Sequence, residues 1–351
     1  MIKLLQNNCF RGSIRPAFKG YTDTTTMKDG LGCNSDTMCI HQTYFFRNLE
    51  TLDFVKNYIS ENYKKGTNIA DFASSTGEEA YSLAMLLKPK NQDKKYKITG
   101  YDIVPRVIDD MNSRIYELVT GNQIEKMLND SNQEDNGLKK MFDESFERIP
   151  RDWQEFSYTP KNTKKIIDRL VKTKDDKEKR ELNYMLSFSK IPPQYVWNDY
   201  VIPKKSAFDG IVDFKVRDIS ELGQTFELPK NTGVVFFKNA FYHLIRKYPD
   251  GSFDLSAAEN VAKEINKSLP KNGLLVTGAL QRDQFYNGQA PSGKVVQNGK
   301  AIDVFLDSPF QKMLSKNGFE PVFFEQVNDM DANPLLRGVY LPSVWKKVSE
   351  V

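Results

Sequence analysis

The chain has 351 residues, of which 39% are hydrophobic and 12% aromatic, so it can bury a sizeable core. This composition excludes an intrinsically disordered protein, and no run approaches the roughly 20 apolar residues of a transmembrane helix. The 50 Lys and Arg against 46 Asp and Glu give a net charge of +4, which is too balanced to indicate nucleic-acid binding. Since Met1–Phe10 lacks the apolar region of a secretory signal, we expect a cytoplasmic protein with no membrane insertion.

Residues 1–40 are rich in Thr, Asn, Asp and Gly and have no sustained apolar period, which predicts a flexible N-terminal tail. All three cysteines, Cys9, Cys33 and Cys39, lie in this tail, and none forms a C-x-x-C pair. Cys33, Cys39 and His41 lack a fourth ligand at the usual spacing. We therefore expect neither a disulfide framework nor a metal site.

An amphipathic helix is predicted directly after the tail. Apolar residues recur at three- and four-residue spacing from Phe45 to Ile59, as on a helix with one buried face, and Gly66 would end it. Phe45 and Phe46 are interpreted as part of the core of this helix.

Short apolar runs then alternate with helical patterns, which predicts an α/β fold with a doubly wound, mostly parallel sheet. The predicted strands are residues 69–72, 98–102, 212–216, 234–237 and 274–278, and the predicted helices are residues 78–87, 105–116 and 257–269. Two final strands, 321–325 and 339–342, are close enough in sequence to form an antiparallel hairpin at a sheet edge.

Two segments interrupt this alternation. Residues 125–199 are dense in Lys, Asp and Glu with helical periodicity, which predicts a helical insertion between residues 41–124 and 200–351 of the sheet domain. The charges of Lys172–Arg180 fit a solvated helix face, with partner docking as the alternative. Residues 281–303 contain three turn dipeptides that end in Gly and predict a loop or a β-hairpin beyond a strand end.

The turn Ala73–Gly77 is the first segment that indicates a ligand. It follows a predicted strand of a parallel sheet, whose ligands bind outside the carboxyl ends of the strands. Its small side chains allow close backbone approach, and the helix N-terminus that it opens suits a carboxylate. Gly77 is its only glycine, so pyrophosphate binding is weakly supported. Asp102 ends the next strand, where an acidic residue binds ribose hydroxyls, although a helix N-cap is the alternative role.

Several segments resemble, in order, the motifs of the CheR-type chemotaxis-receptor glutamate methyltransferases. They are Thr43–Arg47 (TYFFR), Ser75–Ser82 (STGEEAYS), Tyr101–Ile103 (YDI), Val212–Ile219 and Phe236–Asn239. The similarity covers roughly residues 41–118 and 200–280. It implies a Rossmann-like class I methyltransferase sheet with an antiparallel terminal hairpin, S-adenosyl-L-methionine as cofactor, and a protein carboxylate as methyl acceptor. The family's N-terminal helical domain, which contacts receptors, has no counterpart in residues 1–40.

The resemblance also implies a set of residues that line the cofactor pocket: Thr43, Arg47, Glu79, Asp102, Asp218, Ile219, Lys238 and Asn239. Glu79 would accept from a ligand amine or brace the pocket. Arg47 has the fork geometry that holds a carboxylate by two hydrogen bonds, with a surface ion pair as its alternative role. Lys238 stands where the family has Arg, and His243 stands where it has a tyrosine near the transferred methyl. Arg47 and His243 are therefore the candidate catalytic residues.

The expected reaction is an in-line displacement in which a glutamate carboxylate takes the methyl group. A carboxylate is ionised at neutral pH, so positioning and desolvation should supply most of the rate. Two alternatives remain: the same cofactor with another protein or small-molecule acceptor, and a catalytically weak module that binds the cofactor or a partner.

Overall fold

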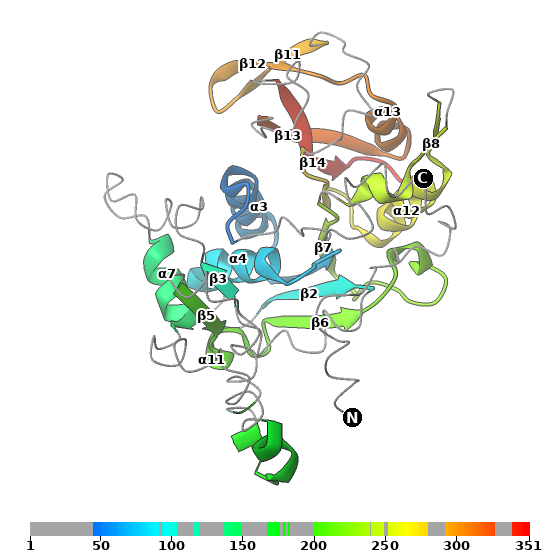
Figure 1. Cartoon of the computed structure of the whole chain (residues 1–351). Helices are drawn as coiled ribbons and strands as arrows, with labels where there is room; N and C mark the ends of the chain where they lie inside the picture. The colour runs from blue at the N-terminus through cyan, green and yellow to red at the C-terminus, as the bar shows by residue number, and fades with distance from the viewer. Residues whose placement is uncertain are drawn as a thin grey trace. The chain divides into compact units, whose positions relative to one another are not determined.

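The computed structural model describes residues 45–90, 93, 95–103, 116–118, 137–148, 167–175, 178–179, 182, 199–238, 240–248, 252–279, 292–326 and 339–351. The chain divides into two compact units, one of residues 1–108 with 210–351 and one of residues 109–209 (Figure 1). The predicted tail, residues 1–40 with its three cysteines, lies outside the described residues, and so does His41.

The first unit is built on a nine-stranded sheet. Its strands are β1 (Thr67–Phe72), β2 (Tyr96–Asp102), β6 (Val212–Val216), β7 (Thr232–Phe236), β10 (Leu274–Val276), β11 (Gly293–Gln297), β12 (Lys300–Val304), β13 (Phe319–Gln326) and β14 (Tyr340–Lys347). Their order is β11-β12-β14-β10-β7-β1-β2-β6, with β13 paired to β14. Strands β6, β2, β1, β7 and β10 are parallel, whereas β14 is antiparallel to both β10 and β13. The predicted doubly wound sheet with an antiparallel terminal pair is confirmed.

The strand order reverses between β1 and β7. From β1 the chain builds outward through β2 and β6, then returns to the other side of β1 with β7 and β10. A crevice for a ligand forms at such a switch point, outside the carboxyl ends of the strands. The end of β1 at Phe72 and the end of β7 at Phe236 therefore mark where a site belongs.

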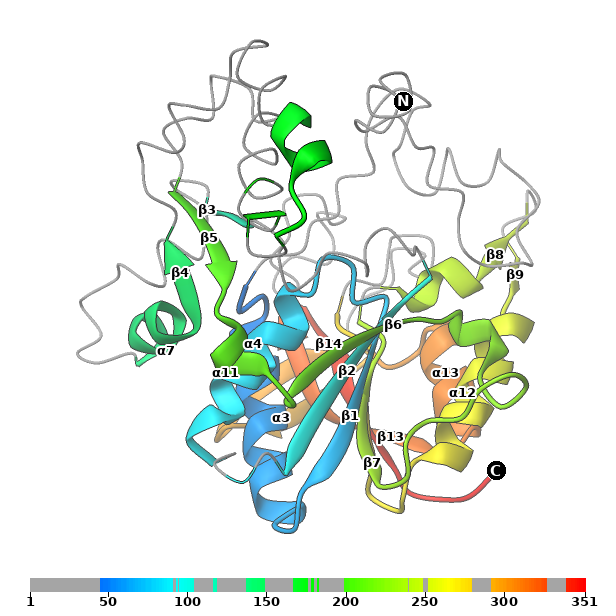
Figure 2. The same ribbon diagram turned by 90° about the horizontal axis from the view of Figure 1, so that it is seen from below.

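Helices cover both faces of this sheet. They are α3 (Leu49–Asn62), α4 (Glu78–Leu87), α12 (Ser256–Ser268) and α13 (Pro309–Lys316). Figure 2 shows α3 and α4 on one side of the sheet and α12 and α13 on the other. On the side of α12, Ala70 and Phe72 of β1 belong to the main hydrophobic core. Because side chains alternate along a strand, Asp71 faces the side of α3 and α4.

The predicted helix after the tail begins later than expected. Phe45 and Phe46 lie in a turn before α3, and Phe46 and Asn48 have φ values of 55° and 57°. Both phenylalanines are nevertheless buried. Helix α3 ends at Asn62, and Gly66, with φ of 97°, then turns the chain into β1. A Cβ at Gly66 would lie 2.4 Å from the Lys95 carbonyl oxygen, so only glycine fits this turn.

The C-terminal part of the sheet follows the sequence prediction in outline. Strands β11 and β12 form a hairpin around Asn298 and Gly299, whose φ values of 52° and 74° suit a two-residue type I′ turn. Helix α13 was not predicted, although Ser308 and Gln311 form a capping box at its start. The predicted helix over residues 105–116 lies outside the described residues except for Tyr116, which opens a strand.

The second unit contains strands as well as helices. Strands β3 (Tyr116–Leu118), β4 (Phe146–Arg148) and β5 (Asp199–Pro203) form an antiparallel sheet in the order β3-β5-β4, beside α7 (Leu138–Ser145) and α11 (Lys205–Phe208). Phe142, Phe146 and Phe208 pack together in its core. Residues 125–199, expected to form a helical insertion, contain the helix α7 and also the strand β4, because a three-residue strand gives no readable alternation in the sequence.

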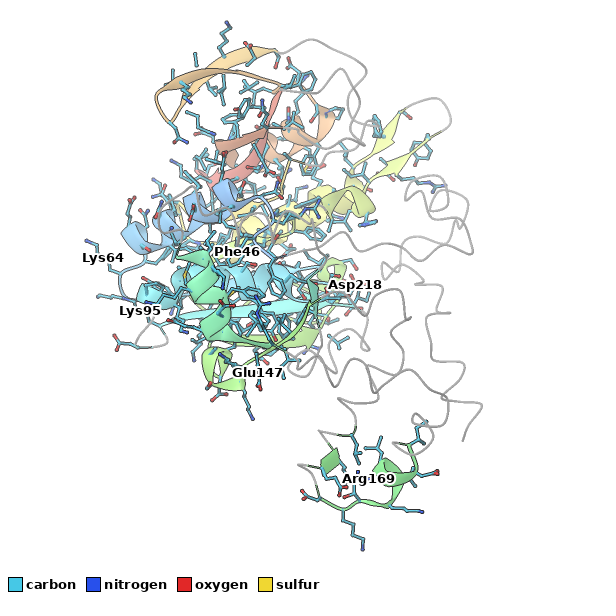
Figure 3. All side chains as sticks on the ribbon, turned by 60° about the vertical axis from the view of Figure 1, so that its left-hand side comes forward. Phe46, Lys64, Lys95, Glu147, Arg169 and Asp218 are labelled. Carbon is cyan, nitrogen blue, oxygen red and sulfur yellow. The ribbon has the colours of Figure 1, made fainter. Side chains whose placement is uncertain are left out.

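Charged residues of the second unit form exposed pairs, such as Arg169 with Glu178 at 2.6 Å (Figure 3). Such pairs contribute little to stability, so they fit a solvated face. In the part of the chain that the structure describes, no helix is both long enough and apolar enough to cross a membrane.

Candidate functional site

The turn between β1 and α4 is tightly wound and conformationally unusual. Ala73, Ser75 and Gly77 have φ values of 55°, 47° and 86°. The first two are strained for residues with a Cβ, and such strain persists only where the surroundings impose it, often at ligand sites. The turn is closed by the Gly77 N–H, which donates to the Ser74 carbonyl at 2.8 Å, and anchored by the Ser74 N–H, which donates to the Tyr101 carbonyl at 3.1 Å.

Unpartnered polar atoms gather around this turn. Six buried side-chain oxygens of the described residues have no hydrogen-bond partner, and four of them belong to Asp71, Ser74, Ser75 and Glu79. Each unsatisfied buried group costs about 1–3 kcal/mol, so a cluster of four is not a stabilising feature of the protein alone. The cluster indicates that a polar ligand supplies the missing hydrogen bonds.

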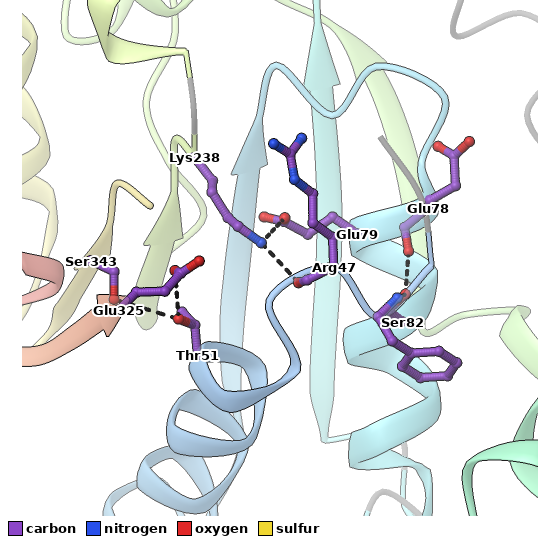
Figure 4. Close-up of polar contacts among 9 residues, drawn as sticks. Arg47, Thr51, Glu78, Glu79, Ser82, Lys238, Glu325 and Ser343 are labelled. Atoms are coloured by element: carbon purple, nitrogen blue, oxygen red, sulfur yellow. Dashed lines mark hydrogen bonds and ion pairs between the residues drawn. The ribbon is translucent and has the colours of Figure 1, made fainter. Parts of the chain in front are cut away.

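A buried ion pair crosses the switch point next to these atoms. Lys238, two residues past β7, donates from Nζ to Glu79 Oε2 at 2.7 Å and to the Arg47 carbonyl oxygen at 3.1 Å (Figure 4). The side chains of Lys238 and Glu79 are only 3% and 15% exposed. The Lys238 ammonium group thus joins Lys238, Glu79 and Arg47, three predicted site residues from distant parts of the sequence.

Arg47 contributes its backbone to this contact and directs its side chain elsewhere. In Figure 4 the guanidinium extends away from the Lys238 ammonium, toward the loops at the ends of β1 and β2. Arg47 itself is partly buried and lies in the turn before α3 rather than on a helix.

Two carboxyl groups that interact with Lys238 and Glu79, those of Asp71 and Glu325, were not predicted from the sequence. Burial raises the pKa of Asp71 well above its ordinary value, and Glu79 adds to this effect while Lys238 opposes it. Burial also raises the pKa of Glu325 on β13, against the opposing effects of Lys238 and of a hydrogen bond from Thr51. An acidic residue inside an otherwise apolar strand was the available signal for Asp71, since Asp is rarely buried without a partner.

Asp102 lies at the end of β2, beside the turn. Its Oδ2 accepts a hydrogen bond from the Ser75 N–H at 3.0 Å, so the carboxylate and the strained turn hold each other. In nucleotide-binding sheets of this type, the acidic residue that binds ribose hydroxyls lies at the carboxyl end of the strand next to the first one. Asp102 lies at that place.

The remaining predicted site residues follow β6 and β7. Asp218 caps a short 3₁₀ helix, η4 (Ile219–Glu221), accepting from the Ser220 N–H at 2.9 Å, and Ile219 packs in the main core (Figure 3). His243 is partly buried in η5 (Phe241–Leu244), where its backbone N–H donates to the Ala240 carbonyl. Thr43 and Asn239 lie outside the described residues.

Comparison with protein families finds a match for the part of the chain that contains the Arg47 turn, the β1–α4 turn and Asp102. Residues 41–147 match the CheR methyltransferase, SAM binding domain. This range includes the Arg47 turn, the β1–α4 turn and Asp102. The match confirms the predicted resemblance, the predicted cofactor and the general class of methyltransferase. The match does not identify the methyl acceptor.

Solved structures that are similar to the chain, at low identity, include two methyltransferases. The N-methyltransferase NodS from Bradyrhizobium japonicum WM9, in complex with S-adenosyl-L-homocysteine, is 9% identical with a TM-score of 0.36, covering 93% of this chain and 100% of that one. The amino pentose methyltransferase CalS10 from Micromonospora echinaspora is 10% identical with a TM-score of 0.34, covering 88% and 100%. No curated protein matches the sequence.

Proposed function

We propose that this chain transfers the methyl group of S-adenosylmethionine to a carboxylate oxygen on a protein, by analogy a glutamate. The observation that carries the proposal is the group of unpartnered buried atoms of Asp71, Ser74, Ser75 and Glu79 at the switch point of the sheet. A ligand with an amino-acid end and a ribose fits this arrangement, because acceptors and hydroxyls surround the turn and Asp102 stands beside it.

The proposed roles follow from the chemistry of each group. The unpartnered oxygens of Asp71 and Glu79 suit an ammonium group, and the hydroxyls of Ser74 and Ser75 suit a carboxylate. Asp102 would accept from ribose hydroxyls. From the resemblance to the family, we further assign Thr43, Asp218, Ile219 and Asn239 to the pocket.

Catalysis in this proposal consists of positioning. The bound cofactor supplies an electrophilic methyl group on a positively charged sulfur. The acceptor carboxylate is already ionised at neutral pH, so the protein need not remove a proton. Arg47 offers two parallel N–H donors to hold that carboxylate in place for the transfer. His243, in η5 after β7, is the second candidate.

The test is methyl transfer with a labelled cofactor. The purified chain is incubated with [methyl-³H]S-adenosylmethionine and cell lysate, and labelled protein is then treated with base. Carboxyl methyl esters release volatile methanol, whereas methylated amines keep their label. Methanol release that depends on the chain supports the proposal. Base-stable label would assign another acceptor, and bound cofactor without any label would assign a binding module.

A further inference from the structure

The turn that carries Arg47 is strained and is held in place from outside. Residues 45–51, here called the Arg47 segment, contain two left-handed residues other than glycine, Phe46 and Asn48. Such residues keep this conformation only when the surrounding structure imposes it, and they cluster at functional sites. Arg47 lies between these two residues, and its guanidinium extends toward the ends of β1 and β2 (Figure 4).

Three hydrogen bonds from distant parts of the chain fix this segment (Figure 4). The Phe46 N–H donates to Ser82 Oγ of α4 at 2.8 Å. Lys238 Nζ donates to the Arg47 carbonyl at 3.1 Å. Thr51 Oγ1 donates to Glu325 Oε2 at 3.0 Å. The first two come from segments beside the cofactor site, but the third comes from β13, 274 residues away in sequence.

The contact between Thr51 and Glu325 is desolvated. Thr51 is fully buried, and Glu325 is only 8% exposed. Thr51 also lies 3.5 Å from the Ser343 hydroxyl of β14, and its own N–H donates to the Asn48 carbonyl at 3.0 Å. The backbone hydrogen bond from Thr51 links it to the left-handed Asn48. By holding Thr51 in place, the Glu325 side chain therefore also fixes the end of the Arg47 segment.

The surroundings of Glu325 fit the same role. Burial, the largest effect, raises the pKa of Glu325, and Glu79 adds to this effect. Lys238, the hydrogen bond from Thr51 and Arg47 lower the same pKa. A buried carboxyl group is costly without a hydrogen bond, and the Thr51 hydroxyl donates one to Glu325 Oε2 at 3.0 Å.

We propose that Glu325 is a positioning residue that anchors the Arg47 segment through Thr51, so that the C-terminal strand β13 helps to aim Arg47 at the methyl acceptor. The part concerning the acceptor rests on the proposed function. The anchoring itself is a property of the folded chain and can be measured without any acceptor.

The experiment compares full-length variants that differ in one hydrogen bond. Thr51→Val removes the donor and keeps the shape, whereas Thr51→Ser keeps the donor. Glu325→Met removes the acceptor, whereas Glu325→Gln keeps it. Thr232→Val is the matched control, because Thr232 is also buried and its hydroxyl also donates, to the Pro229 carbonyl at 2.6 Å, at the opposite end of β7.

The first readout is hydrogen–deuterium exchange of a peptide spanning residues 45–62. The second is the rate of base-labile methyl transfer to lysate protein, which is compared with the affinity of the same variant for S-adenosylhomocysteine. We expect Thr51→Val and Glu325→Met to speed exchange at least tenfold and to lower transfer at least tenfold, with affinity changed less than threefold. Thr51→Ser and Glu325→Gln should stay within threefold of the native chain in both. Thermal unfolding of every variant confirms that it is folded.

The outcomes separate the two proposals. If Thr51→Val and Glu325→Met exchange no faster than Thr232→Val, the anchor is overturned. If exchange rises but transfer falls only as far as in the control, the role of the anchor in aiming Arg47 is overturned. If the native chain transfers no base-labile methyl, the proposed function fails, and faster exchange in both anchor variants would then still support the anchor.

Discussion

Lys238 Nζ lies 2.7 Å from Glu79 Oε2, so the chain after β7 is joined to the first turn of α4 across the switch point of the sheet. The attraction in a buried pair offsets the cost of desolvating both charges only while both partners are present. The pair therefore makes the integrity of the site depend on two residues that are 159 positions apart.

Removing one partner of this pair should destabilise the fold strongly. Lys238→Met leaves the Glu79 carboxylate buried without its cation, and we expect the free energy of unfolding to fall by about 3–5 kcal/mol. Urea unfolding followed by circular dichroism measures this loss. Adding Glu79→Gln should recover part of it, because the uncompensated charge is then gone. Lys263→Met, which removes an exposed pair with Glu259, should cost less than about 1 kcal/mol. Similar losses in both single variants would contradict the prediction.

Asp102 should contribute to cofactor affinity. Asp102→Ala removes both the proposed ribose acceptor and the partner of the Ser75 N–H, so the affinity should weaken by about 1–3 kcal/mol. Calorimetric titration with S-adenosylhomocysteine checks this. Asp213→Ala is the matched control, since Asp213 is an exposed carboxylate on the neighbouring strand β6. Unchanged affinity in a folded Asp102→Ala protein would remove this residue from the site.

The sequence predicted the sheet because its central strands are short apolar runs bounded by turn residues. Helix α4 has the predicted limits, and β6 does as well. The start of α3 was missed because Phe45 and Phe46 continue its apolar spacing, and periodicity does not encode the sign of φ. The capping box of Ser308 and Gln311 could have revealed α13, since that signal is local.

The site was predictable only where a motif marked it. The resemblance singled out Arg47, Glu79 and Lys238, and the structure brings them into contact. Asp71 and Glu325 were missed because each lies in a run that predicted a strand. The acidic residue within an apolar run marked Asp71 as unusual, but the groups that surround Asp71 and Glu325 are known only after folding.

The pKa of Asp71 gives the stability a pH dependence of known sign. Burial and Glu79 raise the pKa of Asp71 above its ordinary value of 3.8, so the folded chain holds this proton more tightly than the unfolded chain. The resulting stabilisation is full below the ordinary pKa and is lost as the pH rises through the folded pKa. Asp71→Asn lacks this dependence.

We therefore expect the free energy of unfolding of Asp71→Asn, minus that of the native chain, to increase from pH 4 to pH 8. Urea unfolding of the ligand-free proteins across this range measures the difference. Glu325, whose pKa is also raised, is present in both proteins, so its contribution largely cancels. The variant should also bind S-adenosylhomocysteine more weakly if the unpartnered Asp71 oxygen is a ligand acceptor. Parallel stability profiles would show that Asp71 has the same pKa in both states.

Arg47 should matter more for turnover than for holding the cofactor. Its backbone carbonyl accepts a hydrogen bond from Lys238, and its guanidinium extends toward the ends of β1 and β2 (Figure 4). A guanidinium and a sulfonium repel each other, so Arg47 should not favour S-adenosylmethionine over S-adenosylhomocysteine. Arg47→Lys keeps the charge but loses the fork that binds a carboxylate by two hydrogen bonds.

Methyl transfer by Arg47→Lys should accordingly fall about ten- to a hundredfold, equal to roughly 1.4–2.7 kcal/mol, while cofactor affinity changes less. The rate of base-labile labelling and calorimetric titration with both forms of the cofactor give the two quantities. Arg169→Lys, an exposed arginine of the second unit, serves as the control for the substitution. Equal loss of binding and turnover would make Arg47 a cofactor clamp. If neither changes, the acceptor must be bound by other groups, and His243 becomes the first residue to substitute.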